Sequence, residues 1–311
     1  MDVILHAGAH RTGTTSFQSY LRANRTRLQG QGIGFWGPWR TRTGLLDSVA
    51  ARPESAEAAQ RAAGRVALNL EGSRRQGVSA LVVTDENMIG ALRRGLRARA
   101  LYPGIGERMA RLHGAFGGPT RIVLQIRALD DWWTSALTWA VPRGEGLPRP
   151  DTLEAISRGT RGWRDVITDL ACACPGTQIL VTEFDTFAAR PDRLLAAMTG
   201  RRSLPPALPG AFHDNRRPGR DALCEVLTAR GTPADRLSAV PPGGAWALFD
   251  DRQAARLRET YADDLFWLRA GADGLATLTE DPAPARPRLN LAAAAKLRGT
   301  DDDRPARKLA P

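Results

Sequence analysis

The N-terminal segment constrains the fold more than any other part of the chain. An apolar run at residues 3–5 (Val-Ile-Leu) predicts a buried strand that ends before Gly8. From Thr14 onward, apolar residues such as Phe17 and Leu21 recur at helical spacing and predict an amphipathic helix. Between a strand and a helix, a glycine loop presents backbone N–H groups to an anion where the helix dipole is positive. We therefore expect an anion site at this loop.

Three later apolar runs predict further strands, at residues 80–84, 121–126 and 178–182. Because stretches with helical patterns separate them, they indicate βαβ units. We expect an α/β fold with three layers, α/β/α, around a mostly parallel central sheet. Ligands of such sheets bind beyond the carboxyl ends of the strands. Helices are expected at residues 51–70, from Asp130, at 191–198 and at 252–268.

Composition divides the chain into one domain, residues 1–280, and a flexible tail, residues 281–311. The tail is rich in proline and aspartate and holds few core residues. Two segments inside the domain, 30–45 and 201–220, are expected to be loops because glycine, tryptophan, proline and arginine dominate them.

The net charge of +11 comes almost entirely from arginine, which supplies all but two of the 44 basic residues. The arginines are scattered, which argues against nucleic acid as a partner and leaves a basic cleft for a multiply anionic small ligand. The three cysteines lack the spacing of a zinc site, and no apolar run reaches about 18 residues. We expect a cytoplasmic protein without a membrane span, whose oligomeric state the sequence leaves open.

The loop itself, residues 8–15, reads Gly-Ala-His-Arg-Thr-Gly-Thr-Thr. The ATP-binding form of such a loop, G-x-x-x-x-G-K-[ST], places a lysine after its second glycine. Thr14 stands at that position here, and the permanent positive charge enters earlier, at Arg11. This argues against a kinase or an ATPase.

Residues 6–15 (His-Ala-Gly-Ala-His-Arg-Thr-Gly-Thr-Thr) resemble the 5′-phosphosulfate loop of PAPS-dependent sulfotransferases of the bacterial type. The family usually has lysine before [ST]-G-T-[ST], and Arg11 replaces it. The resemblance implies a P-loop NTPase-like fold, PAPS (3′-phosphoadenosine-5′-phosphosulfate) as co-substrate and no metal. The family's lysine contacts the bridging oxygen and stabilises the departing 5′-phosphate, which makes Arg11 a catalytic candidate. We expect Arg11→Lys to retain or improve activity. The residues implied to hold the donor are Gly8, Arg11, Thr12, Gly13, Thr14 and Thr15.

A second constellation lies at the end of the third predicted strand, where Arg127 is followed eight residues later by Ser135. An arginine leaving a strand and a hydroxyl about two helical turns further on can converge on one anion. In sulfotransferases such a pair binds the 3′-phosphate of PAPS. The adenine-side loop of cytosolic members, R-K-G-x-x-G, has only a loose counterpart at residues 215–220 (Asn-Arg-Arg-Pro-Gly-Arg).

Sulfuryl transfer also needs a base for the proton of the acceptor. Glu86, at the end of the second predicted strand, is the first choice, with Asp85 and His10 as alternatives; His10 can equally brace the loop. Tryptophans such as Trp36 and Trp139 can line an acceptor pocket or belong to the core.

The sequence predicts transfer of a sulfuryl group from PAPS to a hydroxyl or amine of an unidentified small-molecule, carbohydrate or lipid acceptor. Two other functions stay open, a P-loop phosphotransferase that uses ATP and a noncatalytic nucleotide-binding protein.

Overall fold

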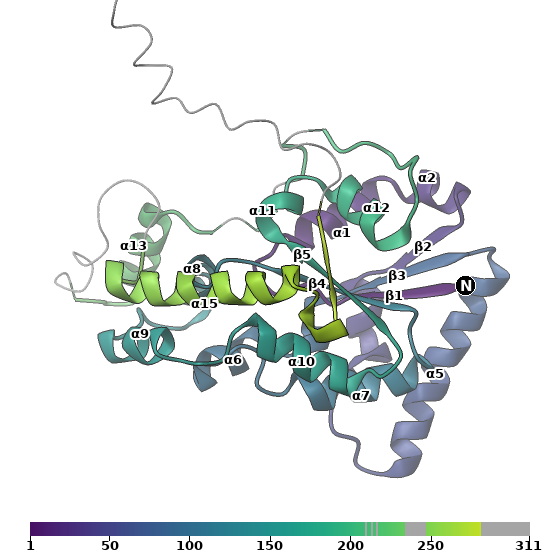
Figure 1. The fold of residues 1–311 in the computed structure, drawn as a ribbon, viewed down its shortest axis with the longest axis horizontal. Coiled ribbons are helices and arrows are strands. Elements are labelled where there is room, and N and C mark those ends of the chain that lie inside the picture. The colour runs from purple at the N-terminus through teal and green to yellow at the C-terminus, as the bar shows by residue number, and fades with distance from the viewer. Residues whose placement is uncertain (209, 213, 216, 234–246, 281–311) are drawn as a thin grey trace, which may run out of the picture. The chain divides into compact units, whose positions relative to one another are not determined.

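A single six-stranded sheet organises the domain in the computed structural model, which describes residues 1–208, 210–212, 214–215, 217–233 and 247–280. All neighbouring strands pair in parallel, in the order β2-β3-β1-β4-β5-β6 (Figure 1). These residues belong to one compact unit, Met1–Glu280. The strands are β1 (Asp2–His6), β2 (Ile33–Trp36), β3 (Ala80–Thr84), β4 (Arg121–Ile126), β5 (Gln178–Glu183) and β6 (Thr277–Thr279).

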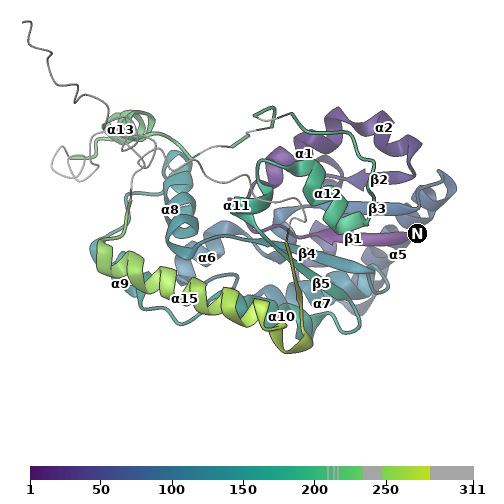
Figure 2. The same cartoon turned by 45° about the horizontal axis from the view of Figure 1, so that its top comes forward.

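Helices cover both faces of this sheet, with α1, α2, α11 and α12 on one side and α5, α7 and α10 on the other (Figures 1 and 2). The longer helices are α1 (Thr14–Ala23), α5 (Ala56–Arg75), α7 (Ile105–Ala115), α8 (Leu129–Ala140), α10 (Trp163–Ala173), α12 (Pro191–Thr199), α13 (Arg220–Ala229) and α15 (Asp251–Arg269). Shorter elements are α2 (Arg25–Gly30), α3 (Pro38–Arg40), η1 (Thr41–Leu45), α4 (Asp47–Ala50), η2 (Glu86–Ile89), α6 (Leu92–Ala98), η3 (Val141–Arg143), α9 (Pro150–Ser157), α11 (Phe184–Phe187) and η4 (Ala272–Gly274).

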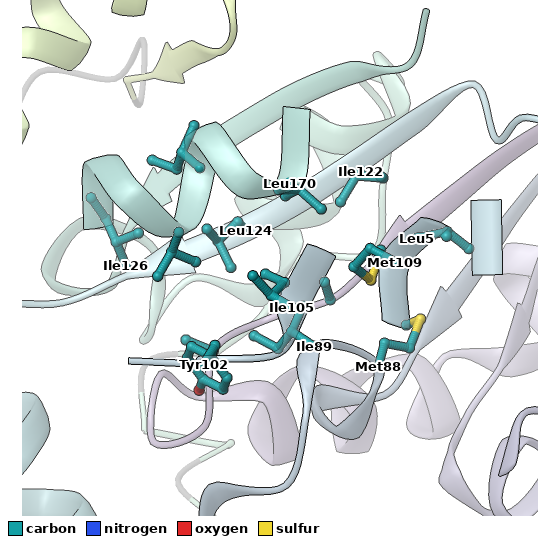
Figure 3. Packing of buried hydrophobic residues seen from close by; sticks show 14 of the residues in the cluster. Leu5, Met88, Ile89, Tyr102, Ile105, Met109, Ile122, Leu124, Ile126 and Leu170 are labelled. Carbon is teal, nitrogen blue, oxygen red and sulfur yellow. The ribbon is translucent and has the colours of Figure 1, made fainter. Parts of the chain in front are cut away.

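The strands are apolar on both faces because each face packs against a helical layer. Along β4, Ile122 and Leu124 enter the core shared with α7 and α10, whereas Val123 between them enters the core shared with α1 and α12. Figure 3 shows the first of these cores, where Ile105 and Met109 of α7 pack with the strand side chains. The three-layer α/β/α arrangement and the parallel sheet are thus confirmed.

The four strands expected from the sequence are present, and the helices predicted near 51–70, 191–198 and 252–268 begin and end within a few residues of those limits. The prediction of a loop at 30–45 was wrong. That segment contains β2, which is only four residues long and pairs with β3, followed by α3 and η1. The predicted tail lies outside the described residues.

The register of the sheet brings several strand ends to one edge. His6, the last residue of β1, pairs with Thr84, the last residue of β3. Ile126 at the end of β4 pairs with Glu183 at the end of β5. The residues that follow these four strands therefore meet at the carboxyl edge of the sheet, where the expected site residues lie.

Candidate functional site

The loop between β1 and α1 depends on backbone conformations that glycine favours. Gly8 and Gly13 have φ values of 28° and 84°, and a Cβ atom at Gly8 would lie 2.6 Å from Thr14 Oγ1. Gly13 is the N-cap of α1, whose first turn begins at Thr14. Arg11 shares the left-handed region, with φ 65°, which costs energy for a residue with a side chain. The loop thus leads into the N-terminus of α1, where the backbone N–H groups of the first turn have no partner within the helix.

His10 braces this loop. Its backbone N–H donates to the Tyr102 hydroxyl at 2.8 Å, and its carbonyl accepts from the Trp132 indole at 2.7 Å. Its ring nitrogens lie 3.1 Å from Asn87 Oδ1 and 3.1 Å from the Tyr102 hydroxyl. With Asn87 Oδ1 accepting from Nε2–H, Nδ1 accepts from Tyr102, as in a neutral imidazole. Burial lowers the pKa of His10 and favours the same form.

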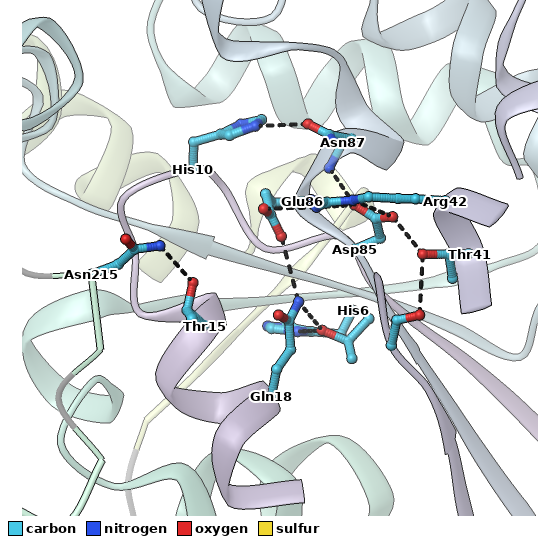
Figure 4. Close-up of polar contacts among 12 residues, drawn as sticks. His6, His10, Thr15, Gln18, Thr41, Arg42, Asp85, Glu86, Asn87 and Asn215 are labelled. Carbon is cyan, nitrogen blue, oxygen red and sulfur yellow. Dashed lines mark hydrogen bonds and ion pairs between the residues drawn. The ribbon is translucent and has the colours of Figure 1, made fainter. Parts of the chain in front are cut away.

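The Thr12 hydroxyl is engaged within the loop, because it donates to the Ala9 carbonyl at 2.5 Å. Thr14 Oγ1 is buried and has no hydrogen-bond partner among the described residues. Thr15 Oγ1 accepts from the Asn215 side-chain amide at 3.1 Å (Figure 4). Of the three threonines expected to hold the donor, Thr14 is therefore the one with an unused hydroxyl.

Four guanidinium groups approach one another beside the loop. The pKa of Arg11 falls to about 10, first because of burial and then because Arg127, Arg143 and Arg217 are near. Burial also lowers the pKa of Arg127. No described carboxylate lies within ion-pair distance of Arg11, whereas Arg127 contacts Asp131 at 3.7 Å. Such a concentration of positive charge favours an anion.

Arg127 reaches the loop from the end of β4. Its Nη1 donates to the Arg11 carbonyl at 3.3 Å, and its guanidinium carbon lies 4.4 Å from the centre of the Phe184 ring. Its Nε is buried with no partner among the described residues. Ser135, on α8, is buried, and its Oγ accepts from Arg11 Nε at 3.0 Å. The structure thus brings Arg127 and Ser135 to the same place as the loop, and the Ser135 oxygen contacts Arg11.

These groups line a pocket of about 370 Å³. Its wall includes the loop residues His10, Arg11 and Gly13, with Glu86 and Arg127 from the ends of β3 and β4 and Ser135 from α8. The wall is completed by Thr14, Thr15, Ser16, Leu92, Trp139, Phe184, Ala188, Asp214, Asn215 and Arg217.

The carboxylates after β3 lie near the loop, and Arg42 contacts both of them (Figure 4). Asp85 is almost fully buried and accepts from the Thr41 hydroxyl at 2.6 Å, from Arg42 at 2.7 Å and from the Asn87 backbone N–H at 2.9 Å. Glu86 contacts Arg42 at 2.8 Å and Gln18 at 3.4 Å. Glu86 lines the pocket, whereas Asp85 serves to hold the β3 end to the segment after β2. Of the two carboxylates, only Glu86 is placed to meet a ligand.

His6 lies beneath the loop, fully buried. Its Nδ1 shares a hydrogen bond with Thr84 Oγ1 at 2.9 Å, and its Nε2 has no partner among the described residues. Burial lowers the pKa of His6 to about 3, so the ring is neutral at ordinary pH.

Several residues of the site were not predicted from the sequence, among them Arg42, Gln18, Arg143 and Phe184. Phe184 had the clearest signal, because it lies just beyond the carboxyl end of a predicted strand. Of the loose adenine-side match at residues 215–220, Asn215 and Arg217 line the pocket, and Arg216 lies outside the described residues. Trp36 and Trp132 are buried in the core, and Trp139 lines the pocket.

Comparison with protein-family models, with curated proteins and with solved structures gives no match. Within the described part of the chain, no helix is both long and apolar enough to cross a bilayer. The function must therefore be argued from the residues of the pocket.

Proposed function

We propose that this chain is a sulfotransferase that moves a sulfuryl group from PAPS to a hydroxyl or amine acceptor on a P-loop NTPase-like fold. The observation that carries the proposal is the meeting of two half-buried arginines, Arg11 and Arg127, with the glycine loop in one pocket. PAPS carries anionic groups on both the 3′ and 5′ sides of its ribose, and a pocket with several guanidinium groups suits such a ligand better than one with a single cation.

The unused polar atoms of the pocket fit such a nucleotide. Thr14 Oγ1 and Arg127 Nε are buried without a described partner, and buried polar groups left unpaired are costly. On this proposal the loop and Thr14 hold the 5′-phosphosulfate, and Arg127 with Arg217 holds the 3′-phosphate. The faces of Phe184 and Trp139 supply apolar wall for the adenine.

The transfer step assigns a role to Glu86. The acceptor oxygen or nitrogen attacks the sulfur, the bond from sulfur to the bridging oxygen breaks, and that oxygen leaves with the electron pair on the 5′-phosphate of PAP. Glu86 takes the acceptor's proton, and Arg11 stabilises the charge that develops on the leaving phosphate. Arg42 and Gln18 hold the Glu86 carboxylate by its two oxygens, while His10 keeps the loop in shape.

The arrangement favours PAPS over ATP for two reasons. Thr14 stands where ATP-binding loops carry lysine. Asp85, the acidic residue that directly follows β3, is engaged by Thr41, Arg42 and the Asn87 N–H rather than facing the pocket.

The test is transfer of ³⁵S from labelled PAPS to a panel of phenol, sugar and lipid acceptors, with PAP release measured in parallel. The proposal predicts acceptor-dependent label transfer that Glu86→Gln suppresses, while ATP with magnesium gives no phosphoryl transfer to the same panel. PAP binding without any transfer would instead favour a noncatalytic nucleotide-binding protein.

A further inference from the structure

Helix α5 carries a stripe of residues opposite the face that it buries, at the margin of the domain (Figure 1). Its buried side is centred on Val66. With about 3.6 residues per turn, six residues of the helix project within roughly 40° of the direction opposite Val66. They are Glu57, Arg61, Gly64, Leu68, Glu71 and Arg75. Leu68 keeps 75% of its surface exposed, so this stripe is available to a partner.

The spacing of the stripe is typical of a contact between two helices. Its members follow one another at alternating steps of four and three residues, the repeat that keeps one seam of a helix facing a partner helix. At the centre of the seam, Gly64 and Leu68 help to line an apolar depression of the surface. A single exposed leucine is ordinary in a folded protein, so the residues around it must indicate which partner fits.

The charges of the stripe are complementary to the same stripe in reverse order. Arg61 and Glu71 lie five residues to either side of Val66 and have opposite charges. Glu57 and Arg75 lie nine residues to either side and are again opposite. A second α5 that runs antiparallel, related by a two-fold axis at the level of Val66, would therefore place an opposite charge against each of these four residues. In a parallel pair each charge would face its own copy, which is unfavourable.

The two central residues complement each other in shape. Gly64 and Leu68 lie two residues to either side of Val66, so each copy of Leu68 would lie over Gly64 of the other copy. A Cβ atom at Gly64 would meet nothing within 4 Å in the single chain, which leaves the space above it open. Glycine in an exposed helix lowers helix stability relative to alanine, and the close approach of a leucine gives this glycine a use.

We infer that α5 is a dimerisation surface on which a second copy of this chain binds in antiparallel orientation. Each half of the helix pair then holds an electrically neutral cluster, formed by Glu57 and Arg61 of one copy with Glu71 and Arg75 of the other. Glu71 and Arg75 already form an ion pair of 3.1 Å within the helix, so the partner's Arg61 extends an existing pair. Such reversed complementarity is what an isologous contact requires, and it gives no advantage with an unrelated chain.

Charge reversal in the full chain tests the inference by sedimentation equilibrium. One helix pair is a small contact, so we expect the wild type to dimerise with a Kd between about 1 µM and 1 mM. Arg61→Glu and Glu71→Arg each leave two uncompensated like charges in every cluster, and each should weaken dimerisation at least about tenfold. The double variant is neutral again and should return to within about threefold of the wild type.

Mixing the two single variants separates pairing across the interface from effects within one chain. A heterodimer of Arg61→Glu with Glu71→Arg has two neutral clusters, whereas each homodimer has like charges in both. We therefore expect the mixture to associate at least about tenfold more tightly than either variant alone. A wild type that stays monomeric up to about 1 mM, or a mixture no tighter than its components, would overturn the inference.

Gly64→Leu tests the shape of the contact. The new side chain fills the space that the partner's Leu68 needs, so dimerisation should weaken at least about tenfold, while the helix content by circular dichroism is retained. Gly114→Leu on α7 is the matched control, because Gly114 is also an exposed helical glycine whose Cβ would meet nothing within 4 Å. It should dimerise as the wild type does. Equal losses in the two variants, or none in Gly64→Leu, would contradict the α5 contact.

Dimerisation and nucleotide binding can be tested separately. None of the described residues that line the pocket belongs to α5, so the α5 variants should keep the Kd of PAP within about twofold of the wild type. Failure of PAP to bind would reject the proposed function and leave the sedimentation result unaffected.

Discussion

Charged side chains are paired differently in two regions around the pocket. On the side of β1, β4 and β5, the half-buried Arg11 and Arg127 lie near other arginines with few carboxylates, and Arg11 has only a serine as its side-chain partner in the described chain. On the side of β3, Asp85 and Glu86 share the single guanidinium of Arg42. Charges that are paired within the chain hold its parts together, whereas charges left without partners are available to a ligand.

This contrast assigns different tasks to neighbouring residues of similar type. Arg42 and Arg127 are both partly buried arginines near the same loop, but Arg42 bonds two carboxylates whereas Arg127 keeps one buried nitrogen without a described partner. Arg42 is therefore expected to contribute to the stability of the fold, and Arg127 to ligand binding. Variants of the two sides should separate the tasks.

The largest effect is expected for catalysis at Glu86. Glu86→Gln keeps the size of the side chain and removes its ability to accept a proton, so turnover of PAPS should fall by roughly 10²–10⁴-fold while the Kd of PAP changes little. Steady-state kinetics with the acceptor identified in the panel measures the turnover, and calorimetry measures the Kd of PAP. Full activity of this variant would move the base to another group, with Asp85 and His10 as the remaining candidates.

Arg127→Ala should weaken PAP binding by about 2–4 kcal/mol, because it removes a desolvated cation from an anionic ligand. Its unfolding free energy should change by less than about 2 kcal/mol, since the variant loses a long contact to Asp131, one carbonyl bond and the contact with the Phe184 ring. Arg75→Ala, at an exposed arginine on α5, is the control. An unchanged Kd for PAP would remove Arg127 from the site.

Arg42→Met should show the reverse pattern. It leaves Asp85 buried without its cation, so the unfolding free energy should fall by about 1–3 kcal/mol, while the Kd of PAP should stay within about twofold. Urea denaturation and calorimetry on the same samples give both quantities. A large loss of PAP affinity with an unchanged unfolding free energy would contradict the assignment of Arg42 to the fold and of Arg127 to the ligand.

A smaller, pH-dependent effect is expected from His6, whose pKa is lowered from 6.5 to about 3 by burial. Below pH 6.5 the unfolded chain takes up a proton that the folded chain refuses, so stability is full above pH 6.5 and is lost as the pH falls toward 3. The loss approaches about 1.4 kcal/mol per pH unit. In His6→Asn this component should vanish, and parallel stability curves for the two proteins between about pH 4.5 and 6.5 would contradict it.

The sequence was sufficient for features that rest on local patterns. Buried strands of five or six residues such as β1, β3, β4 and β5 are largely apolar, and the loop before α1 has its glycines at fixed places. Glu86 and Arg127 could be placed at the pocket because each follows such a strand. The parallel sheet then brings their strand ends together without further information.

Contacts between distant segments could not be predicted in this way. Arg42 lies in a segment whose composition is typical of a loop, and its pairing with Asp85 depends on β2, a four-residue strand that includes a glycine. The three-residue β6 was missed for the same reason of length. The hydrogen bond from Arg11 to Ser135 joins two motifs that the sequence presents separately, and only their packing reveals it.

Binding of PAP in the presence of a chelator tests the central claim most directly. With EDTA present, calorimetry should give a single site for PAP with an unchanged Kd, and 5′-AMP, which lacks the 3′-phosphate, should bind at least about tenfold more weakly. ATP with magnesium should bind more weakly than PAP. Loss of PAP binding on chelation, or tighter binding of ATP with magnesium, would contradict the assignment of the pocket to PAPS.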